Sequence, residues 1–107
     1  MRELLVVETR DAAEHRDPAR VMELVAGMHR NGIPATVFLT ENAAFNARSG
    51  AFGAVDEAVS KGITIAVDRF ALEERGILED QLSAGIAVAD VGLIVDRLRS
   101  GSCVMWR

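Results

Sequence analysis

The sequence has 107 residues, of which half are hydrophobic and about a quarter are charged, and this composition indicates one soluble globular domain spanning residues 1–107. Twelve basic residues against sixteen acidic ones give a net charge of −4, and because the basic residues are scattered, nucleic acid is not expected as a partner. One cysteine and two separated histidines rule out an internal disulfide and offer no metal-ligand spacing, so we predict neither a metal nor another cofactor.

The apolar runs are short. Residues 4–7 and 86–89 fall far below the span of about 20 residues that a membrane helix needs. Glutamates at positions 3 and 8 interrupt the first ten residues, so no signal-peptide core fits there. We therefore expect a cytoplasmic protein without a membrane partner.

The first predicted strand covers residues 4–7, a continuous apolar run that is typical of a strand buried on both faces. After a polar loop, Asp17 and Pro18 predict a helix start, because aspartate can cap free amides and proline loses nothing at the first helical position. Apolar residues then recur at helical spacing, which predicts the buried face of this helix: Val21, Leu24, Val25 and Met28.

The middle of the chain repeats this order. Residues 34–40 predict the second strand, and the stretch 46–54, which contains two glycines, is predicted to be the loosest part of the chain. A short helix over residues 55–59 ends at Gly62. Residues 63–67 then predict a third strand.

The last third alternates in the same way. One or two helical turns are predicted over residues 70–75, a brief strand over 86–88 and a terminal strand over 102–106. Asp90 is predicted to cap the last helix, whose apolar residues repeat the helical spacing: Val91, Ile94, Val95 and Leu98. This alternation predicts a three-layer α/β/α sandwich around a mostly parallel sheet of about five strands.

Polar residues follow the first three predicted strands. In open parallel sheets ligands collect at the carboxyl ends of the strands, so we predict a ligand-binding rim there, formed by Glu8, Arg10, Thr40, Asn42, Asp68 and Arg69. Arg10 and Arg69 could hold an anion between two guanidiniums while Asp68 or Glu8 handles a proton.

Each of these residues also has a structural interpretation. Thr40 is expected to cap a helix more readily than to bind a ligand, and Asp68 could cap the turn that follows it and pair with Arg69 or Arg75. Arg10 and Arg69 could simply be solvated.

Two residues of the terminal strand need separate treatment. Cys103 is predicted to be a small hydrophobic residue of the core rather than a reactive thiol, although sulfur transfer by an accessible Cys103 is kept as a further hypothesis. Trp106 must either close over the core or join a subunit interface.

The stretch SKGITIAVDRFALEERGILEDQLSAGIAVADVGLIVDRL, residues 60–98, resembles the DsrE/DsrF-like family of sulfur-relay proteins. The matching pieces are a glycine before an apolar strand, an Arg-Gly-Ile after a short polar turn, and an apolar segment before the final helix. RNGIPATVFLTENA, residues 30–43, also resembles the family's helix end, second strand and following loop. The resemblance implies a DsrE-like fold and assembly into oligomers.

Active members of that family carry a cysteine just after the third strand, which accepts a persulfide and passes it to a partner. Residues 68–72 of this chain read Asp, Arg, Phe, Ala and Leu, and a carboxylate cannot hold a transferable sulfur, because that step requires a thiolate. The resemblance therefore implies a non-catalytic subunit or binding protein without sulfurtransferase activity and without catalytic residues. Its partners would be copies of itself, related DsrE-like subunits or a sulfur-carrier protein.

Overall fold

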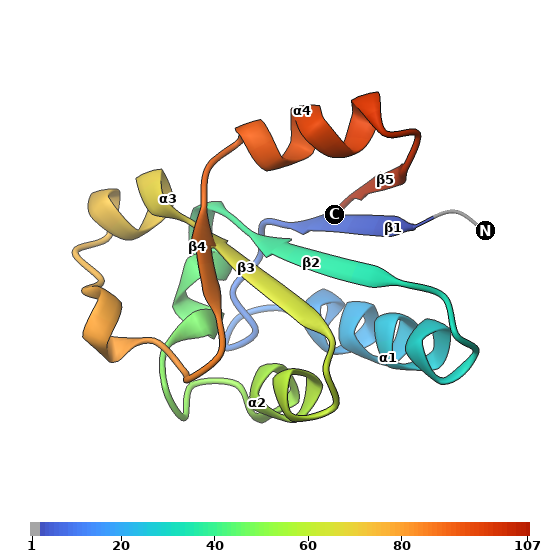
Figure 1. Ribbon diagram of the computed structural model, residues 1–107. Helices are drawn as coiled ribbons and strands as arrows, with labels where there is room; N and C mark the ends of the chain where they lie inside the picture. The colour runs from blue at the N-terminus through green and yellow to red at the C-terminus, as the bar shows by residue number, and fades with distance from the viewer. Residues whose placement is uncertain (1–2) are drawn as a thin grey trace.

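Residues 3–107 of the chain, which the computed structural model describes, fold around a sheet of five parallel strands in the order β4-β3-β2-β1-β5 (Figure 1). The strands are β1 (Leu4–Glu8), β2 (Ala35–Leu39), β3 (Thr64–Asp68), β4 (Ala87–Ala89) and β5 (Cys103–Trp106). All four pairings between them are parallel. This confirms the prediction of an α/β sandwich with a sheet of about five strands.

The connections are helical. They comprise α1 (Asp17–Arg30), α2 (Gly53–Ser60), α3 (Arg69–Glu74) and α4 (Gly92–Arg99), with the 3-10 helices η1 (Glu41–Ala47) and η2 (Glu79–Gln81). η1 covers the beginning of the stretch that was predicted to be loose. Three of its alanines are fully buried, because small side chains let this turn pack closely against the sheet.

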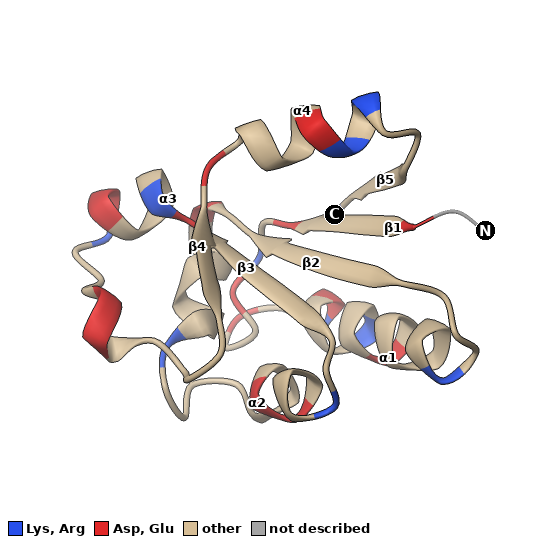
Figure 2. Cartoon of the chain, viewed as in Figure 1, with Lys and Arg blue, Asp and Glu red and all other residues tan. Residues whose placement is uncertain are grey.

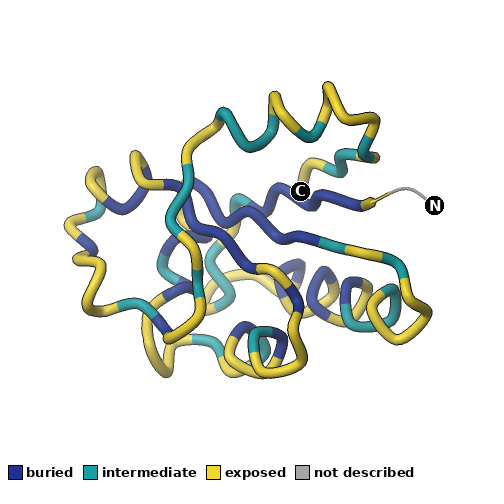
Figure 3. The backbone as a smooth tube through the Cα atoms, in the orientation of Figure 1, coloured by how far each residue is buried: buried dark blue, intermediate teal, exposed yellow. Residues whose placement is uncertain are grey.

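The two faces of the sheet are covered unequally. Alternate residues of β1 to β3 point toward α1 and α2 and form a large core that also includes side chains of η1 and α3. On the opposite face a smaller cluster of Leu5, Val7, Phe38 and Ala66 packs against Leu93 and Ile94 of α4. In Figures 1 and 3 the central strands are buried between these layers, whereas α4 is half-buried or exposed.

Helix α4 departs from its predicted face. Ile94 packs on the sheet, but the other three apolar residues at the predicted spacing are exposed: Val91 by 60%, Val95 by 46% and Leu98 by 58%. The helix is apolar on two sides, and Leu93 with Ile94 supplies the side that contacts the sheet. Val91, and not the predicted Asp90, occupies the N-cap position, without a side-chain hydrogen bond. Asp90 lies one residue earlier, where its Oδ1 accepts a hydrogen bond from the N–H of Gly92, the first residue of the helix, at 2.8 Å.

The start of α1 also differs from the prediction. Arg16 occupies the N-cap position without a side-chain hydrogen bond, and Asp17 is the first helical residue rather than the cap. On the predicted buried face Leu24 is 40% exposed, and the neighbouring Met22 is buried instead. Asp17 is buried as well, so its carboxyl group has partners other than free helix amides.

Candidate functional site

The carboxyl ends of β1, β2 and β3 meet at one edge of the sheet, as predicted from the order of the elements. The Thr40 N–H donates to the backbone oxygen of Glu8 at 3.0 Å, which ties the end of β2 to the end of β1. Thr40, Glu8 and Asp68 are all buried. The rim is therefore a set of buried polar groups, with exposed arginines around it.

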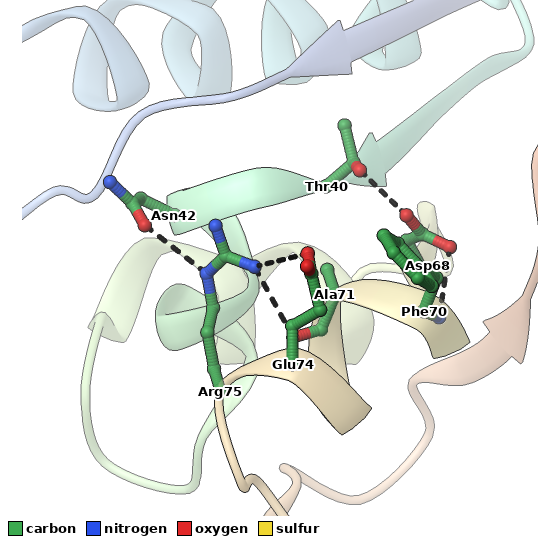
Figure 4. Close-up of polar contacts among 7 residues, drawn as sticks. All are labelled: Thr40, Asn42, Asp68, Phe70, Ala71, Glu74 and Arg75. Carbon is green, nitrogen blue, oxygen red and sulfur yellow. Dashed lines mark hydrogen bonds and ion pairs between the residues drawn. The ribbon is translucent and has the colours of Figure 1, made fainter.

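Asp68 is held by two hydrogen bonds at this edge (Figure 4). Its Oδ2 accepts from the Thr40 hydroxyl at 2.7 Å and its Oδ1 from the Phe70 N–H at 3.2 Å. The second contact confirms that Asp68 caps α3. Thr40 occupies the N-cap position of η1, but its side-chain oxygen accepts no helix N–H, so the prediction that it caps a helix is wrong. Its hydroxyl instead donates to Asp68 across the strand ends, a charge-assisted hydrogen bond.

The exposed rim residues divide into separate groups of contacts. Arg69 pairs with Glu79 at 3.1 Å, rather than with Asp68. Asn42 accepts a hydrogen bond from Arg75 Nε at 3.1 Å, and Arg75 also contacts Glu74 and the Ala71 carbonyl oxygen (Figure 4).

Two grooves lie away from this rim. One, of about 590 Å³, runs between α1 and α2, and the other, of about 400 Å³, lies at the amino ends of the strands. None of the six predicted rim residues lines either groove. Ligand binding by Arg10, Asp68 and their neighbours stays a prediction, and the contacts of Thr40 and Asp68 already account for their burial.

A second polar group, which was not predicted from the sequence, connects Glu8 of the rim to Asp17 and Arg107. Glu8 is 1% exposed and Asp17 is 7% exposed. Glu8 Oε2 accepts from the Thr9 N–H at 3.1 Å, and Asp17 Oδ1 accepts from the Arg107 guanidinium. Burial, reinforced by the neighbouring Asp17 carboxyl, raises the pKa of Glu8 to about 7, although the Thr9 N–H and the Arg10 charge act to lower it.

One signal in the sequence could have located part of this group. Side chains alternate along a strand, so Glu8 shares the face of Leu4 and Val6, which the following helix covers. A glutamate on that face needs a polar partner. Asp17, the first acidic residue of the helix, was instead interpreted as a cap, and the approach of Arg107 depends on the pairing of β5 with β1.

Cys103 is exposed, so the prediction that it belongs to the core is wrong. It pairs with Leu4 at the beginning of β5, on the edge of the sheet, where a strand has a neighbour on one side only. Trp106 is 61% exposed and therefore does not close over the core.

Within residues 3–107, no group of three or more His, Cys, Asp or Glu side chains could hold a metal ion. Nor does this part contain a helix that is long and apolar enough to cross a membrane.

A comparison with protein-family models found no match, nor did one with curated proteins. Solved structures, however, are similar over nearly the whole chain. The YchN protein from E. coli shares 13% sequence identity at a TM-score of 0.88, with 100% of both chains covered. The protein of unknown function MTH1491 from Methanobacterium thermoautotrophicum shares 20% identity at a TM-score of 0.75, covering 99% of this chain and 98% of that one.

A third structure, of the conserved protein of unknown function BT1422 from Bacteroides thetaiotaomicron, shares 17% identity at a TM-score of 0.78 and covers 98% of this chain and 94% of its own. At such low identities the likeness shows the fold alone. The chain thus has the fold of YchN and MTH1491.

Proposed function

We propose that this chain is a non-catalytic DsrE-like subunit or binding protein that assembles with copies of itself or with related subunits. The observation that carries the proposal is the exposed apolar stripe on the outer side of α4, formed by the N-cap residue Val91 together with Val95 and Leu98. These residues follow one another at i, i+4 and i+7, so they lie on one side of the helix. The fold shared with YchN and MTH1491 and the sequence resemblance of residues 60–98 support the family part of the proposal.

The stripe has the chemistry of a protein interface. Three large aliphatic side chains on one short helix exceed the scattered apolar residues that an ordinary surface carries. The first turn of α4 contains no charged residue, in contrast to α1 and α2 (Figure 2). Burying each of these side chains against a partner would contribute about 1.5 kcal/mol or more.

Trp106 extends the apolar surface on the same side of the sheet. Val104 packs in the cluster with Leu93 and Ile94, and because side chains two residues apart in a strand share a face, Trp106 also lies on the α4 side. Tryptophan is a residue type that concentrates binding energy in interfaces. A stable interface buries about 800 Å² from each partner, a modest share of the 5927 Å² surface of this chain.

The link to sulfur metabolism rests on the resemblance. Asp68 to Leu72 hold no thiol where active DsrE-like proteins carry their cysteine, so the chain would support a relay in the cytoplasm by binding a catalytic subunit or a sulfur carrier rather than by accepting sulfur. Incubation with a persulfide-charged donor should leave the intact mass unchanged. A gain of one sulfur that disappears in Cys103→Ser would contradict the non-catalytic role.

Light scattering after size-exclusion chromatography tests the assembly. Wild-type protein should elute as an oligomer at high concentration, and Leu98→Glu should shift it to the monomer, because a carboxylate in an apolar interface is costly. Leu78→Glu is the matched control, since Leu78 is 62% exposed but lies outside α4. A wild-type monomer at all concentrations, alone and with candidate subunits, would end the proposal.

A further inference from the structure

Two buried carboxyl groups, those of Glu8 at the end of β1 and Asp17 at the start of α1, lie within hydrogen-bonding reach of each other. Each has one oxygen with a partner, as described above. Within residues 3–107 the other two oxygens, Glu8 Oε1 and Asp17 Oδ2, have no hydrogen-bond partner. Ionised carboxylates only accept hydrogen bonds, so these two oxygens can satisfy each other only if a proton lies between them.

A single proton also matches the one guanidinium that, within residues 3–107, contacts the pair directly. With one proton the carboxyl pair carries one negative charge, which the guanidinium of Arg107 neutralises through Asp17. Arg10, in the loop after β1, is a further positive charge that acts on Glu8. The contact from β2 is uncharged, since it is the Thr40 N–H bound to the Glu8 backbone oxygen.

Hydrogen bonds also connect the end of β1 to Arg107, the residue that follows β5. The backbone N–H of Arg107 donates to the backbone oxygen of Val7 at 2.8 Å. Its own backbone oxygen accepts from the Thr9 N–H at 3.0 Å and from the Thr9 hydroxyl at 2.7 Å. Asp17, Glu8 and Arg107 therefore join α1, β1 and the residue after β5 at one point, where the two carboxyl groups are buried and the Arg107 side chain reaches solvent.

We propose that Glu8 and Asp17 hold one proton in common, and that its release to solvent is a switch that loosens the first turn of α1 and Arg107 from the end of β1. Once the proton is lost, two negatively charged carboxylates remain close together in a buried site, each with one oxygen that has no hydrogen-bond donor. Separation of the two groups relieves this repulsion. The raised pKa of Glu8 agrees with this geometry, and the inference does not depend on assembly.

Trp106 provides a reporter for the switch. It is the only tryptophan, the sequence has no tyrosine, and it directly precedes Arg107. In dilute, monomeric wild-type protein we expect its fluorescence to change in a single one-proton transition with a midpoint near pH 7. In Glu8→Gln the side-chain amide can donate to Asp17 and has no proton to lose, so the transition should be absent.

His15 and His29 provide the necessary control, because histidine is the side-chain type most often responsible for pH-dependent changes near neutrality. The double variant His15→Gln/His29→Gln should keep the transition. If the transition disappears in this double variant and persists in Glu8→Gln, the proposal is wrong.

A second readout does not depend on the sensitivity of Trp106. Carbon-13 NMR of the side-chain carboxyl of Glu8 should show a midpoint near pH 7 in the wild type and a lower midpoint in Asp17→Asn, which removes the neighbouring like charge. A wild-type midpoint near the ordinary glutamate value of 4.5 would overturn the shared proton.

Discussion

Asp68 stands at the first of the five positions where the family resemblance places a cysteine, and both of its carboxylate oxygens are used within the fold. One accepts from the Thr40 hydroxyl of the neighbouring strand end and the other caps α3. A residue held in this way fixes the distance between the ends of β2 and β3. Its carboxylate thus orders this edge of the sheet.

Removal of the Thr40 hydroxyl tests this role. Thr40→Val keeps the shape of the side chain but leaves Asp68 Oδ2 buried without its donor, so the free energy of unfolding should fall by about 1–3 kcal/mol. Thr40→Ser should restore most of it. Ser60→Ala removes an exposed hydroxyl and should cost no more than about 0.5 kcal/mol; equal losses for Thr40→Val and Ser60→Ala, measured by urea unfolding, would contradict the account.

Because of Glu8, the free energy of unfolding should fall as pH rises, which is the opposite of the effect of a carboxyl group whose pKa is lowered by folding. Its pKa is raised in the folded state from 4.5 to about 7, so the folded protein holds the proton more tightly than the unfolded chain between these values. The resulting stabilisation is fully present below pH 4.5 and is lost as pH rises through 7.

Comparison with Glu8→Gln isolates this contribution, because the variant lacks the ionisable group. Between about pH 5 and about pH 8 the stability of the wild type should fall by about 2 kcal/mol relative to the variant. Chemical unfolding of both proteins at several pH values measures it. A difference that stays constant with pH would show that Glu8 titrates alike in the folded and unfolded chains.

At the scale of the elements, the loop that leads into β4 packs tightly against α2. Gly85 has a φ of +87°, and a Cβ atom there would lie 2.6 Å from Val59 Cγ1. Both the left-handed backbone and the contact favour glycine. The position of β4 at the edge of the sheet therefore depends on a residue without a side chain.

Substitution of Gly85 by alanine should lower the free energy of unfolding by about 1–3 kcal/mol, since it adds backbone strain and an overlap with Val59. Val59→Ala in the same chain should relieve the overlap and recover part of the loss. Gly53→Ala is the control, because a Cβ atom there meets nothing within 4 Å, and it should be neutral or slightly stabilising. Thermal unfolding measures the stability of the wild type, Gly85→Ala, the double variant Gly85→Ala/Val59→Ala and Gly53→Ala. Equal stability of Gly85→Ala and Gly53→Ala would contradict this packing.

The elements differ in how far the sequence predicts them. The strands β1 to β3 were predicted within one or two residues, because buried parallel strands are continuous apolar runs. The orientation of α4 was not predicted correctly. Val91, Val95 and Leu98 have the spacing of a core-facing side, but the spacing of apolar residues does not show which side of a helix contacts the sheet. The exposure of Cys103 was not predicted for a related reason: an apolar strand at the edge of a sheet has the same sequence pattern as a central strand.

The candidate site was predicted less completely than the fold. The meeting of Glu8, Thr40 and Asp68 follows from the parallel order of the strands. The hydrogen-bond partners of these residues do not follow from the strand order. Thr40 donates to Asp68, which lies 28 positions away in the sequence, and Arg107 donates to Asp17, which lies 90 positions away. Contacts between such distant residues depend on the register of the strands, which no local pattern specifies.

At the scale of the whole molecule, the sheet has one thickly covered face and one that α4 covers thinly. The large core lies on the side of α1 and α2, whereas the cluster under α4 contains four buried residues. The outer side of α4 and Trp106 then present apolar side chains to solvent. This imbalance is the physical basis for the proposed assembly, in which a partner would complete the thinner layer.

Hydrogen–deuterium exchange at low and high protein concentration tests this account most directly. We predict that peptides covering residues 91–106 gain protection as concentration rises, that peptides of α2 do not, and that Leu98→Glu abolishes the gain while Leu78→Glu leaves it intact. Exchange in residues 91–106 that is the same at every concentration, or protection that appears on α1 and α2 instead, would contradict assembly through α4 and β5.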